Sequence, residues 1–316
     1  MRVADVRRVM EPELLQLEGV VGVSHSNPHE VIYIYVENRE QVSYMPRYLD
    51  GVPVITRPIG KLEIVLSRTE RVRPLIGGIS AGHPSITAGT LGVLTNDGKL
   101  LSNNHVFAAS NKGRIGDAIL QPAPYDGGRA YDKVATLERF IRIEEDNNLV
   151  DAAIASPTVD AKKEILDEGV VSGWTDAYAG QVIEKSGRTT GHTYTHVFDT
   201  NATVKIGGYP FGTAIFKDQI LFDNVLGALK GGDSGSLAIT ELFGLKLAVG
   251  LCFAASPVAG VANKIGNVID ALHIDLGTYI PAPSVPSPAT LIPGTIPILL
   301  PAGIMALQEG EKWKSY

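Results

Sequence analysis

Residues 231–236 (GGDSGS) carry the sharpest chemical signal in this 316-residue sequence. Glycines on both sides of Ser234 permit a tight turn that exposes its hydroxyl. A nucleophilic serine needs that exposure, and it also needs backbone N–H groups directed at the oxyanion that develops during acyl transfer. An ordinary Gly-Asp-Ser turn is the alternative interpretation of the same residues.

A serine at its ordinary pKa is a poor nucleophile and needs a base, most often a histidine oriented by a carboxylate. Of the seven histidines, His105 follows an apolar, β-rich run. The carboxylate candidate is Asp151, which stands in the apolar stretch 149–155 and therefore demands a partner. A core histidine and a capping acid are the alternatives. The order His, Asp, Ser is that of double-barrel proteases, although order alone proves little.

The elements that must position these residues are strands. Residues 79 to about 262 contain many short apolar runs separated by glycine- and proline-rich turns, which is typical of an all-β barrel or sandwich. A helix is expected over 263–272, because its apolar residues recur on one face. The spacing places His105 and Asp151 in a first barrel and Ser234 in a second.

Residues 1 to about 66 are predicted to form a small α+β unit. An amphipathic helix is expected over 3–17, bent or split at Pro12. Strands are expected over 20–24 and 31–36, followed by a turn or short helix over 44–50 and a closing hairpin of 51–56 with 61–66. Two histidines at an Asn-Pro turn, His25 and His29, are interpreted as surface residues rather than a metal site.

Composition excludes several classes of protein. The chain has 28 Lys and Arg against 34 Asp and Glu, a net charge of −6, and no basic run that would neutralise phosphates, so nucleic acid is not an expected partner. Its single cysteine, Cys252, excludes an internal disulfide and is expected to be a small core residue. The charged N-terminal residues do not resemble a secretory signal, which predicts a cytoplasmic location.

A proline-rich, apolar tail is expected over residues 281–316. Its stretch 289–307 is long enough to raise the question of a membrane span, but Pro293, Pro297 and Pro301 would interrupt a helix there. We therefore expect the tail to dock on its own chain or on a neighbour rather than to cross a membrane. Docking on a neighbour would make the protein a homo-oligomer.

Several motifs together resemble one family. They are residues 87–92 (TAGTLG), 101–106 (LSNNHV), 121–123 (QPA), 126–128 (DGG), 185–191 (KSGRTTG), 232–236 (GDSGS) and 249–254 (VGLCFA). In this order they resemble the trypsin/chymotrypsin-like serine peptidases, and within them the bacterial and archaeal group similar to the plant narrow-leaf protein. The resemblance spans residues 75–275. It implies a mainly β chain with an α+β N-terminal domain (1–70) and a chymotrypsin-like double six-stranded β-barrel (75–280). The proline-rich tail (281–316) lies outside the resemblance.

The resemblance also implies roles for individual residues. Ser234 would be the nucleophile, His105 the general base and then acid, and Asp151 the group that fixes the imidazole. The backbone N–H groups of Gly232 and Ser234 would form the oxyanion hole. The expected activity is that of a serine endopeptidase acting on proteins or peptides, with no metal and no organic cofactor.

The specificity pocket departs from the trypsin pattern. Ala228 stands at the expected pocket base in place of an acid, so a basic substrate residue would lack its charge partner. Phe253, Ala254 and Ala255 replace the usual wall, which favours an apolar or small P1 residue. Residues 75–78 (LIGG) mimic a zymogen activation site, but we interpret them as a turn into the first barrel.

Two other functional classes remain open. One is a latent or non-catalytic scaffold that keeps the protease fold, in which the tail could cover the cleft. The other is an esterase, because the same constellation cleaves esters. His192 and His196 could face one way on a strand, but two histidines without a third ligand are insufficient for a zinc site.

Overall fold

The structure is a computed structural model that describes residues 2–62 and 67–283. The chain divides into two compact units, residues 1–67 and 68–316, each of which is treated by itself below. None of the helices in the described ranges is long and apolar enough to cross a membrane. The apolar stretch 289–307 and its three prolines lie outside the described residues.

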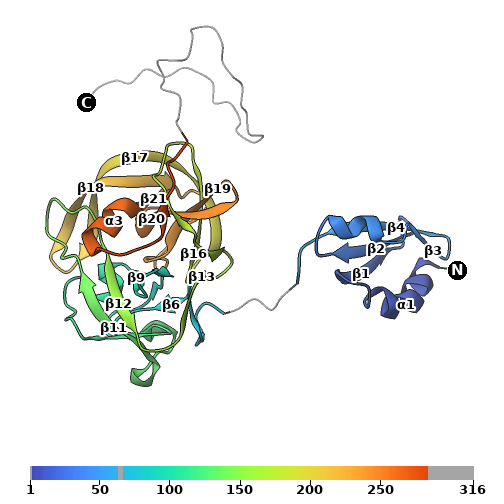
Figure 1. Cartoon of the computed structure of the whole chain (residues 1–316), viewed down its shortest axis with the longest axis horizontal. Coiled ribbons are helices and arrows are strands. Elements are labelled where there is room, and N and C mark those ends of the chain that lie inside the picture. Colours follow the sequence, from blue (N-terminus) through green and yellow to red (C-terminus); the bar gives the residue numbers. More distant parts are fainter. Residues whose placement is uncertain (1, 63–66, 284–316) are drawn as a thin grey trace, which may run out of the picture. The chain divides into compact units, whose positions relative to one another are not determined.

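The N-terminal unit packs one helix on a four-stranded sheet (Figure 1). Its elements are α1 (Val3–Leu14), β1 (Val20–Ser26), β2 (Val31–Val36), a 3-10 turn (Glu40–Tyr44), β3 (Tyr48–Leu49) and β4 (Val52–Pro58). The sheet order is β1-β2-β4-β3. The helix buries Val3, Val6 and Leu14 against the sheet, where Ile32 and Ile34 of β2 are fully buried. The amphipathic pattern therefore specifies both the helix and its contact face.

Two details of this unit differ from the sequence-based expectation. The helix runs through Pro12 and ends at Leu14, three residues short of its predicted end. The expected hairpin of 51–56 with 61–66 is wrong, because β4 pairs in parallel with β2 and forms its hairpin with the two-residue β3. Residues 61 and 62 are not in a strand, and 63–66 lie outside the described residues.

The first barrel of the second unit is built around a five-stranded sheet in the order β10-β11-β12-β9-β8. These strands are β8 (Val93–Leu94), β9 (Leu100–Ser102), β10 (Ala118–Leu120), β11 (Lys133–Phe140) and β12 (Ala153–Pro157). The hairpin of β6 (Ser80–Ala81) with β7 (Gly89–Thr90) continues the wall, since Gly82 bridges to Leu120 of β10. Residues 75–78 were expected to form a turn, but 75–77 form strand β5, which pairs in parallel with β13 (Ala161–Ile165).

The second barrel closes on itself with six strands. They are β16 (Val182–Gly187), β17 (Gly191–Tyr209), β18 (Gly212–Asp223), β21 (Ala259–Lys264), β20 (Leu245–Ala255) and β19 (Leu237–Leu242), in this order around the barrel. Pairing of β19 with both β20 and β16 completes the closure. The short strands β14 (Gly169–Val170), β15 (Gly173–Trp174) and β22 (Thr278–Tyr279) lie outside this ring. The expected mainly β double-barrel fold is confirmed.

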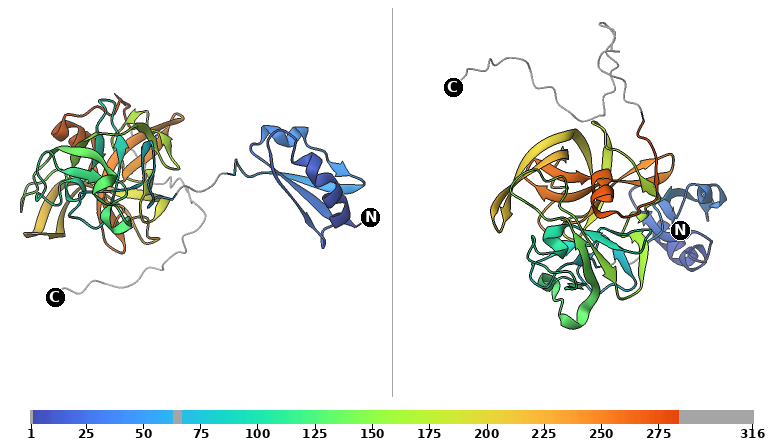
Figure 2. Two further views of the ribbon diagram at one scale, coloured as in Figure 1. Left: turned by 90° about the horizontal axis from the view of Figure 1, so that it is seen from below. Right: turned by 60° about the vertical axis from the view of Figure 1, so that its left-hand side comes forward.

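The two barrels lie against each other (Figures 1 and 2) and share a hydrophobic core. It combines Leu101 and Ile154 of the first barrel with Leu251 of the second and with α3 (Ile265–Leu272), close to the helix predicted over 263–272. Close-packed interiors resist relative movement, so the two barrel mouths are held in a fixed relation. The candidate site lies where they meet.

Candidate active site

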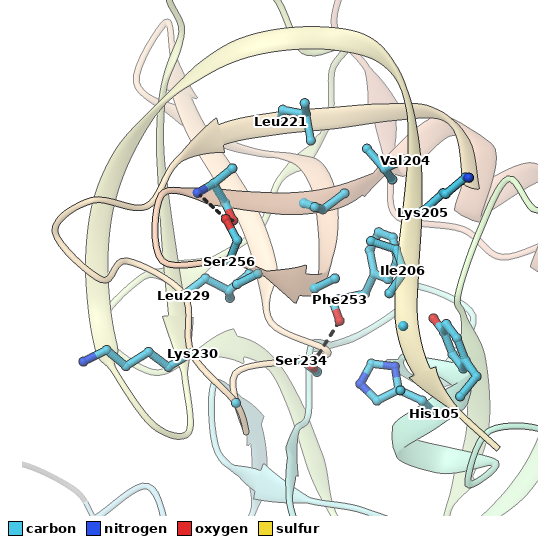
Figure 3. A pocket seen from close by; sticks show the side chains of 18 of the residues that line it. His105, Val204, Lys205, Ile206, Leu221, Leu229, Lys230, Ser234, Phe253 and Ser256 are labelled. Carbon is cyan, nitrogen blue, oxygen red and sulfur yellow. Dashed lines mark hydrogen bonds between the residues drawn. The ribbon is translucent and has the colours of Figure 1, made fainter. Parts of the chain in front are cut away.

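His105 stands at the mouth of the first barrel. The buried strand β9 ends at Ser102, and the chain then forms the short helix α2 (Asn104–Phe107). Val106 and Phe107 anchor this helix in the barrel core, whereas the His105 side chain stays 24% exposed. Its ring lines a cavity that also contains Ser234 (Figure 3).

Asp151 is fully buried and accepts three hydrogen bonds. Its Oδ2 lies 2.7 Å from His105 Nδ1 and accepts a 2.7 Å bond from the Tyr209 hydroxyl, and its Oδ1 accepts the His105 backbone N–H at 3.1 Å. Burial opposes the carboxylate charge, but the His105 charge and these donors outweigh it and hold the pKa of Asp151 below its ordinary value. An ionised Asp151 only accepts, so His105 Nδ1 carries a proton and Nε2 of the neutral ring does not.

The backbone of Asp151 is tied to the second barrel. Its N–H donates to Asn263 Oδ1 at 3.0 Å, and Asn263 in turn donates to Gln219 at 2.7 Å. Its carbonyl accepts from the Asn103 amide at 2.7 Å. All three amide side chains are fully buried, so this network fixes the acid from both barrels.

Ser234 lies in the loop between β18 and β19, and glycine conformations shape that loop. Gly232 and Gly235 both have φ of +95°, which disfavours any residue with a Cβ. A Cβ on Gly235 would also come within 2.2 Å of the Thr90 carbonyl oxygen. The Ser234 carbonyl accepts from the Thr90 N–H at 2.8 Å, and this bond joins the loop to the first barrel.

The Ser234 hydroxyl and the His105 ring face one cavity without a hydrogen bond between them among the described residues. Instead, Ser234 Oγ donates to the Phe253 carbonyl at 3.3 Å (Figure 3). Of the three sequence-predicted residues, His105 and Asp151 are therefore in direct contact. Ser234 lines the same cavity as His105 but is not hydrogen-bonded to it in the described residues.

Asp233 anchors the loop that contains Ser234. It is fully buried and accepts from the N–H groups of Thr189, Thr190 and Lys230 at 2.7–3.0 Å and from the Thr190 hydroxyl at 2.8 Å. Lys185 Nζ lies 3.8 Å away, and burial lowers the pKa of Lys185 while Asp233 opposes that shift. The support that the sequence analysis expected from residues 188–190 is therefore a set of donors to this carboxylate.

The backbone N–H groups of Gly232 and Ser234 donate to no acceptor within the described part of the chain. The Thr189 hydroxyl donates to the Gly231 carbonyl at 2.8 Å. Because the C=O and N–H of a trans peptide point in opposite directions, this bond turns the Gly232 N–H away from Thr189. Both N–H groups are therefore free to donate to a ligand near Ser234.

The cavity beside Ser234 has a volume of about 620 Å³ and a largely apolar lining. Phe253, Ala254 and Ala255 line it, as the sequence predicts for a pocket wall. Apolar side chains from three further strands and the serine loop also contribute: Val204, Ile206, Leu221, Leu229 and Val261. Lys205 and Lys230 are the cationic residues on its lining, and none of the described residues lining it is acidic.

Ala228 is not among the residues that line this cavity, contrary to its predicted place at the pocket base. It is buried, and its carbonyl accepts from the hydroxyls of Thr190 at 3.1 Å and Thr193 at 3.0 Å. These two bonds draw the Ala228 backbone toward the barrel wall. The next residue, Leu229, lines the cavity instead.

Tyr209 is the site residue that sequence reasoning missed. It ends the 19-residue strand β17. Its ring stacks on that of Phe211, with centroids 5.7 Å apart, and lies tilted to that of Phe216, with centroids 6.0 Å apart. Burial and the neighbouring Asp151 charge raise the pKa of Tyr209, so its hydroxyl keeps the proton that it donates. The only local signal is an aromatic residue between two glycines and a proline, which does not indicate a distant carboxylate.

Comparisons with known proteins find similar solved structures. No family model matches the chain, and no curated protein matches it. The crystal structure of a Nocardiopsis protease is 19% identical, covers 64% of this chain and 98% of its own, and has a TM-score of 0.46. An α-lytic protease homologue is 20% identical, with coverages of 64% and 98% and a TM-score of 0.47. A Cellulomonas bogoriensis chymotrypsin is 19% identical, with coverages of 64% and 97% and a TM-score of 0.45.

The two barrels define the class of fold to which this chain conforms. It is the chymotrypsin-like double barrel, with a candidate histidine and acid on one barrel and a candidate serine on the other.

Proposed function

We propose that this protein is a serine endopeptidase with Ser234, His105 and Asp151 as its triad. The observation that carries the proposal is the pairing of His105 with a fully buried Asp151, on the rim of the cavity that also contains Ser234. A buried carboxylate that accepts from Nδ1 fixes the tautomer in which Nε2 is a base. The resemblance of sequence motifs to trypsin-like peptidases supports the same conclusion.

In the proposed reaction, His105 Nε2 takes the Ser234 hydroxyl proton while Oγ forms a bond to the scissile carbonyl carbon. The carbonyl electron pair moves to the oxygen, and the free N–H groups of Gly232 and Ser234 stabilise this oxyanion. The C–N bond then breaks, and the His105 imidazolium, stabilised by Asp151, gives its proton to the leaving amine. Water, deprotonated by His105, hydrolyses the acyl-enzyme and restores Ser234.

The Ser234 hydroxyl must turn from Phe253 toward His105 for this reaction. Its bond to the Phe253 carbonyl is long at 3.3 Å, and a rotation about one side-chain torsion breaks only that bond. Such hydrogen bonds often tighten only when substrate binds. The Phe253 carbonyl would then be released to accept from the substrate backbone.

We expect peptides with Leu or Phe at P1 to be cleaved with a kcat/KM about 10–100-fold higher than the same peptides with Lys or Arg. The cavity beside Ser234 is lined by apolar side chains and two lysines, so a basic P1 group would enter without a charge partner. A matched panel of peptides that differ only at P1 measures this preference. A higher kcat/KM for Lys or Arg would contradict the assignment of this cavity to P1.

Labelling with a fluorophosphonate tests the proposed nucleophile without knowledge of the substrate. The probe requires an activated hydroxyl next to an oxyanion hole, so we expect the intact chain to be labelled and Ser234→Ala to be unlabelled. Ser256→Ala is the matched control, because Ser256 lines the same cavity and has no basic partner. Labelling that survives in Ser234→Ala would exclude Ser234 as the nucleophile.

The bond from Ser234 to the Phe253 carbonyl favours a second candidate function, that of a latent or non-catalytic scaffold with the same fold. In this alternative the hydroxyl stays turned away from His105, and the intact chain resists the fluorophosphonate. Removal of the tail, residues 281–316, separates the two forms of this alternative. A latent protease gains labelling when these residues are removed, and a scaffold does not.

A further inference from the structure

A second cluster of charged side chains lies on the second barrel, outside the cavity that contains Ser234. It comprises Glu168, from the segment between β13 and β14, Glu184 of β16, His192 of β17 and Lys246 of β20. The Glu168 side chain is fully buried and that of Glu184 is 8% exposed, whereas those of His192 and Lys246 are about a quarter exposed. The two carboxylates are thus buried in the protein, and the cluster reaches solvent at His192 and Lys246.

The four carboxylate oxygens of Glu168 and Glu184 fall into two pairs, one facing Lys246 and the other facing His192. Lys246 Nζ donates to Glu168 Oε2 at 2.9 Å and also to Glu184 Oε1. The other two oxygens, Glu168 Oε1 and Glu184 Oε2, each lie 3.1 Å from His192 Nε2. Lysine therefore holds one oxygen of each carboxylate, and the remaining oxygen of each converges on one imidazole nitrogen.

One nitrogen cannot satisfy both oxygens. Nε2 carries at most one hydrogen, and it is positioned to donate to Glu184 Oε2. Glu168 Oε1 is left buried with no hydrogen-bond partner among the described residues. A buried carboxyl oxygen without a partner is costly, and Glu168 Oε1 lies 3.1 Å from His192 Nε2 of the same cluster.

We propose that Glu168, Glu184 and His192 form a zinc site. The ligand atoms Glu168 Oε1, Glu184 Oε2 and His192 Nε2 all lie within 4.8 Å of one another, and two of the separations are 3.1 Å. A tetrahedral Zn²⁺ with bonds of about 2.0–2.1 Å separates its ligands by about 3.3 Å. One cation between these atoms gives Glu168 Oε1 the partner that the single hydrogen of His192 Nε2, directed at Glu184, does not.

Lys246 would support the metal ligands without binding the metal itself. It binds the two carboxylate oxygens that do not face His192, so it orients both glutamates without occupying a ligand position. With a neutral His192, the two carboxylates and Lys246 leave a net charge of −1 for a dication to offset. A water at the open side completes four-coordination.

The site would stabilise the second barrel rather than take part in peptide hydrolysis. Its ligands join the connection that leaves the first barrel, at Glu168, to two strands of the second barrel, at Glu184 and His192. None of the three ligands lines the cavity beside Ser234. The second histidine considered in the sequence analysis, His196, is exposed four residues further along β17 and is not a member.

Calorimetric titration of the full-length, chelator-treated chain with ZnCl₂ tests the proposal, with zinc content and thermal unfolding measured in parallel. We expect one Zn²⁺ per chain and a higher Tm with zinc. His192→Ala and Glu168→Gln should each weaken binding by at least about tenfold. His196→Ala, on the same strand, and His105→Ala, at the candidate active site, should bind as the unaltered chain does.

Three results would overturn the proposal. The first is an absence of saturable zinc binding to the unaltered chain. The second is equal affinity in the unaltered chain, His192→Ala and Glu168→Gln, which would place the ion elsewhere. The third is equal binding of Mg²⁺ or Ca²⁺, since those ions prefer six or more oxygen ligands and would not identify an imidazole site. Circular dichroism of both variants verifies that they are folded.

Discussion

We expect Ser234→Ala and His105→Ala each to lower kcat on a peptide with an apolar P1 residue by about 10⁶-fold, and the double variant to lose no more than either single variant. The physical reason is that the two residues act as one unit. Without His105 the hydroxyl keeps its proton, and without Ser234 the base has no proton to take. The free N–H groups beside Ser234 remain in both variants and leave a small residual rate.

The chain offers a matched control for the histidine. His83 is also in the first barrel, and its Nε2 lies 3.0 Å from Asp117 Oδ2, but it does not line the cavity that contains Ser234. His83→Ala removes another histidine–aspartate contact of the first barrel and is expected to keep its kcat. Equal losses in His83→Ala and His105→Ala would indicate a general loss of structure, and additive losses in the double variant would contradict a shared mechanism.

His105 and Asp151 were identifiable from the sequence because local patterns mark them. A histidine that follows an apolar strand and an acid inside an apolar run both require a special environment, and the structure brings them into contact. His83 shows the limit of this reasoning. It also pairs with an acid, Asp117, and its local sequence gives no sign of this contact.

Residues that act through the tertiary structure could not be found in this way. Tyr209 lies 58 residues from Asp151 and reaches it because the long strand β17 ends beside the mouth of the first barrel. The same holds for Glu168 and Glu184, whose sequence neighbours give no local sign of a shared partner. Ala228 does not line the cavity, and the contacts of its carbonyl with two threonine hydroxyls could not be predicted from the local sequence.

The fold was predictable where the pattern is strong. The repeated short strands and the amphipathic helix near residue 265 depend on hydrophobic periodicity, which local sequence carries. The N-terminal hairpin was wrong because β3 has only two residues, too few for a period to be recognised. Parallel pairing of β4 with β2 depends on contacts between distant segments, and no local pattern specifies it.

Asp151→Asn is expected to lower kcat/KM by about 10⁴-fold at neutral pH while the chain stays folded. Oδ1 of Asp151 accepts the fixed backbone N–H of His105, so the amide oxygen of an asparagine must take that place. Its NH₂ group then faces His105 Nδ1 and donates to it. The proton of the neutral ring moves to Nε2, and the ring can no longer accept from Ser234.

Tyr209→Phe is the matched comparison, since it removes a donor to the same carboxylate without reversing the tautomer. It keeps the His105 Nδ1–H bond to Asp151, so we expect kcat/KM to fall by no more than about tenfold, with a loss of about 1–3 kcal/mol in unfolding free energy. Steady-state kinetics and denaturant unfolding separate the two effects. Equal kinetic losses in both variants would show that Asp151 acts through packing and not through the tautomer of His105.

The pH dependence of stability gives Asp151→Asn a second readout. The pKa of Asp151 is lower in the folded chain than its ordinary value, so its ionised form contributes stability above the unfolded-state pKa. This contribution is lost as the pH falls through the folded-state pKa. Asparagine does not titrate, so the unfolding free energy of Asp151→Asn should fall less steeply with acid than that of the unaltered chain. Parallel acid-unfolding profiles would mean that Asp151 is not held ionised by His105 and Tyr209.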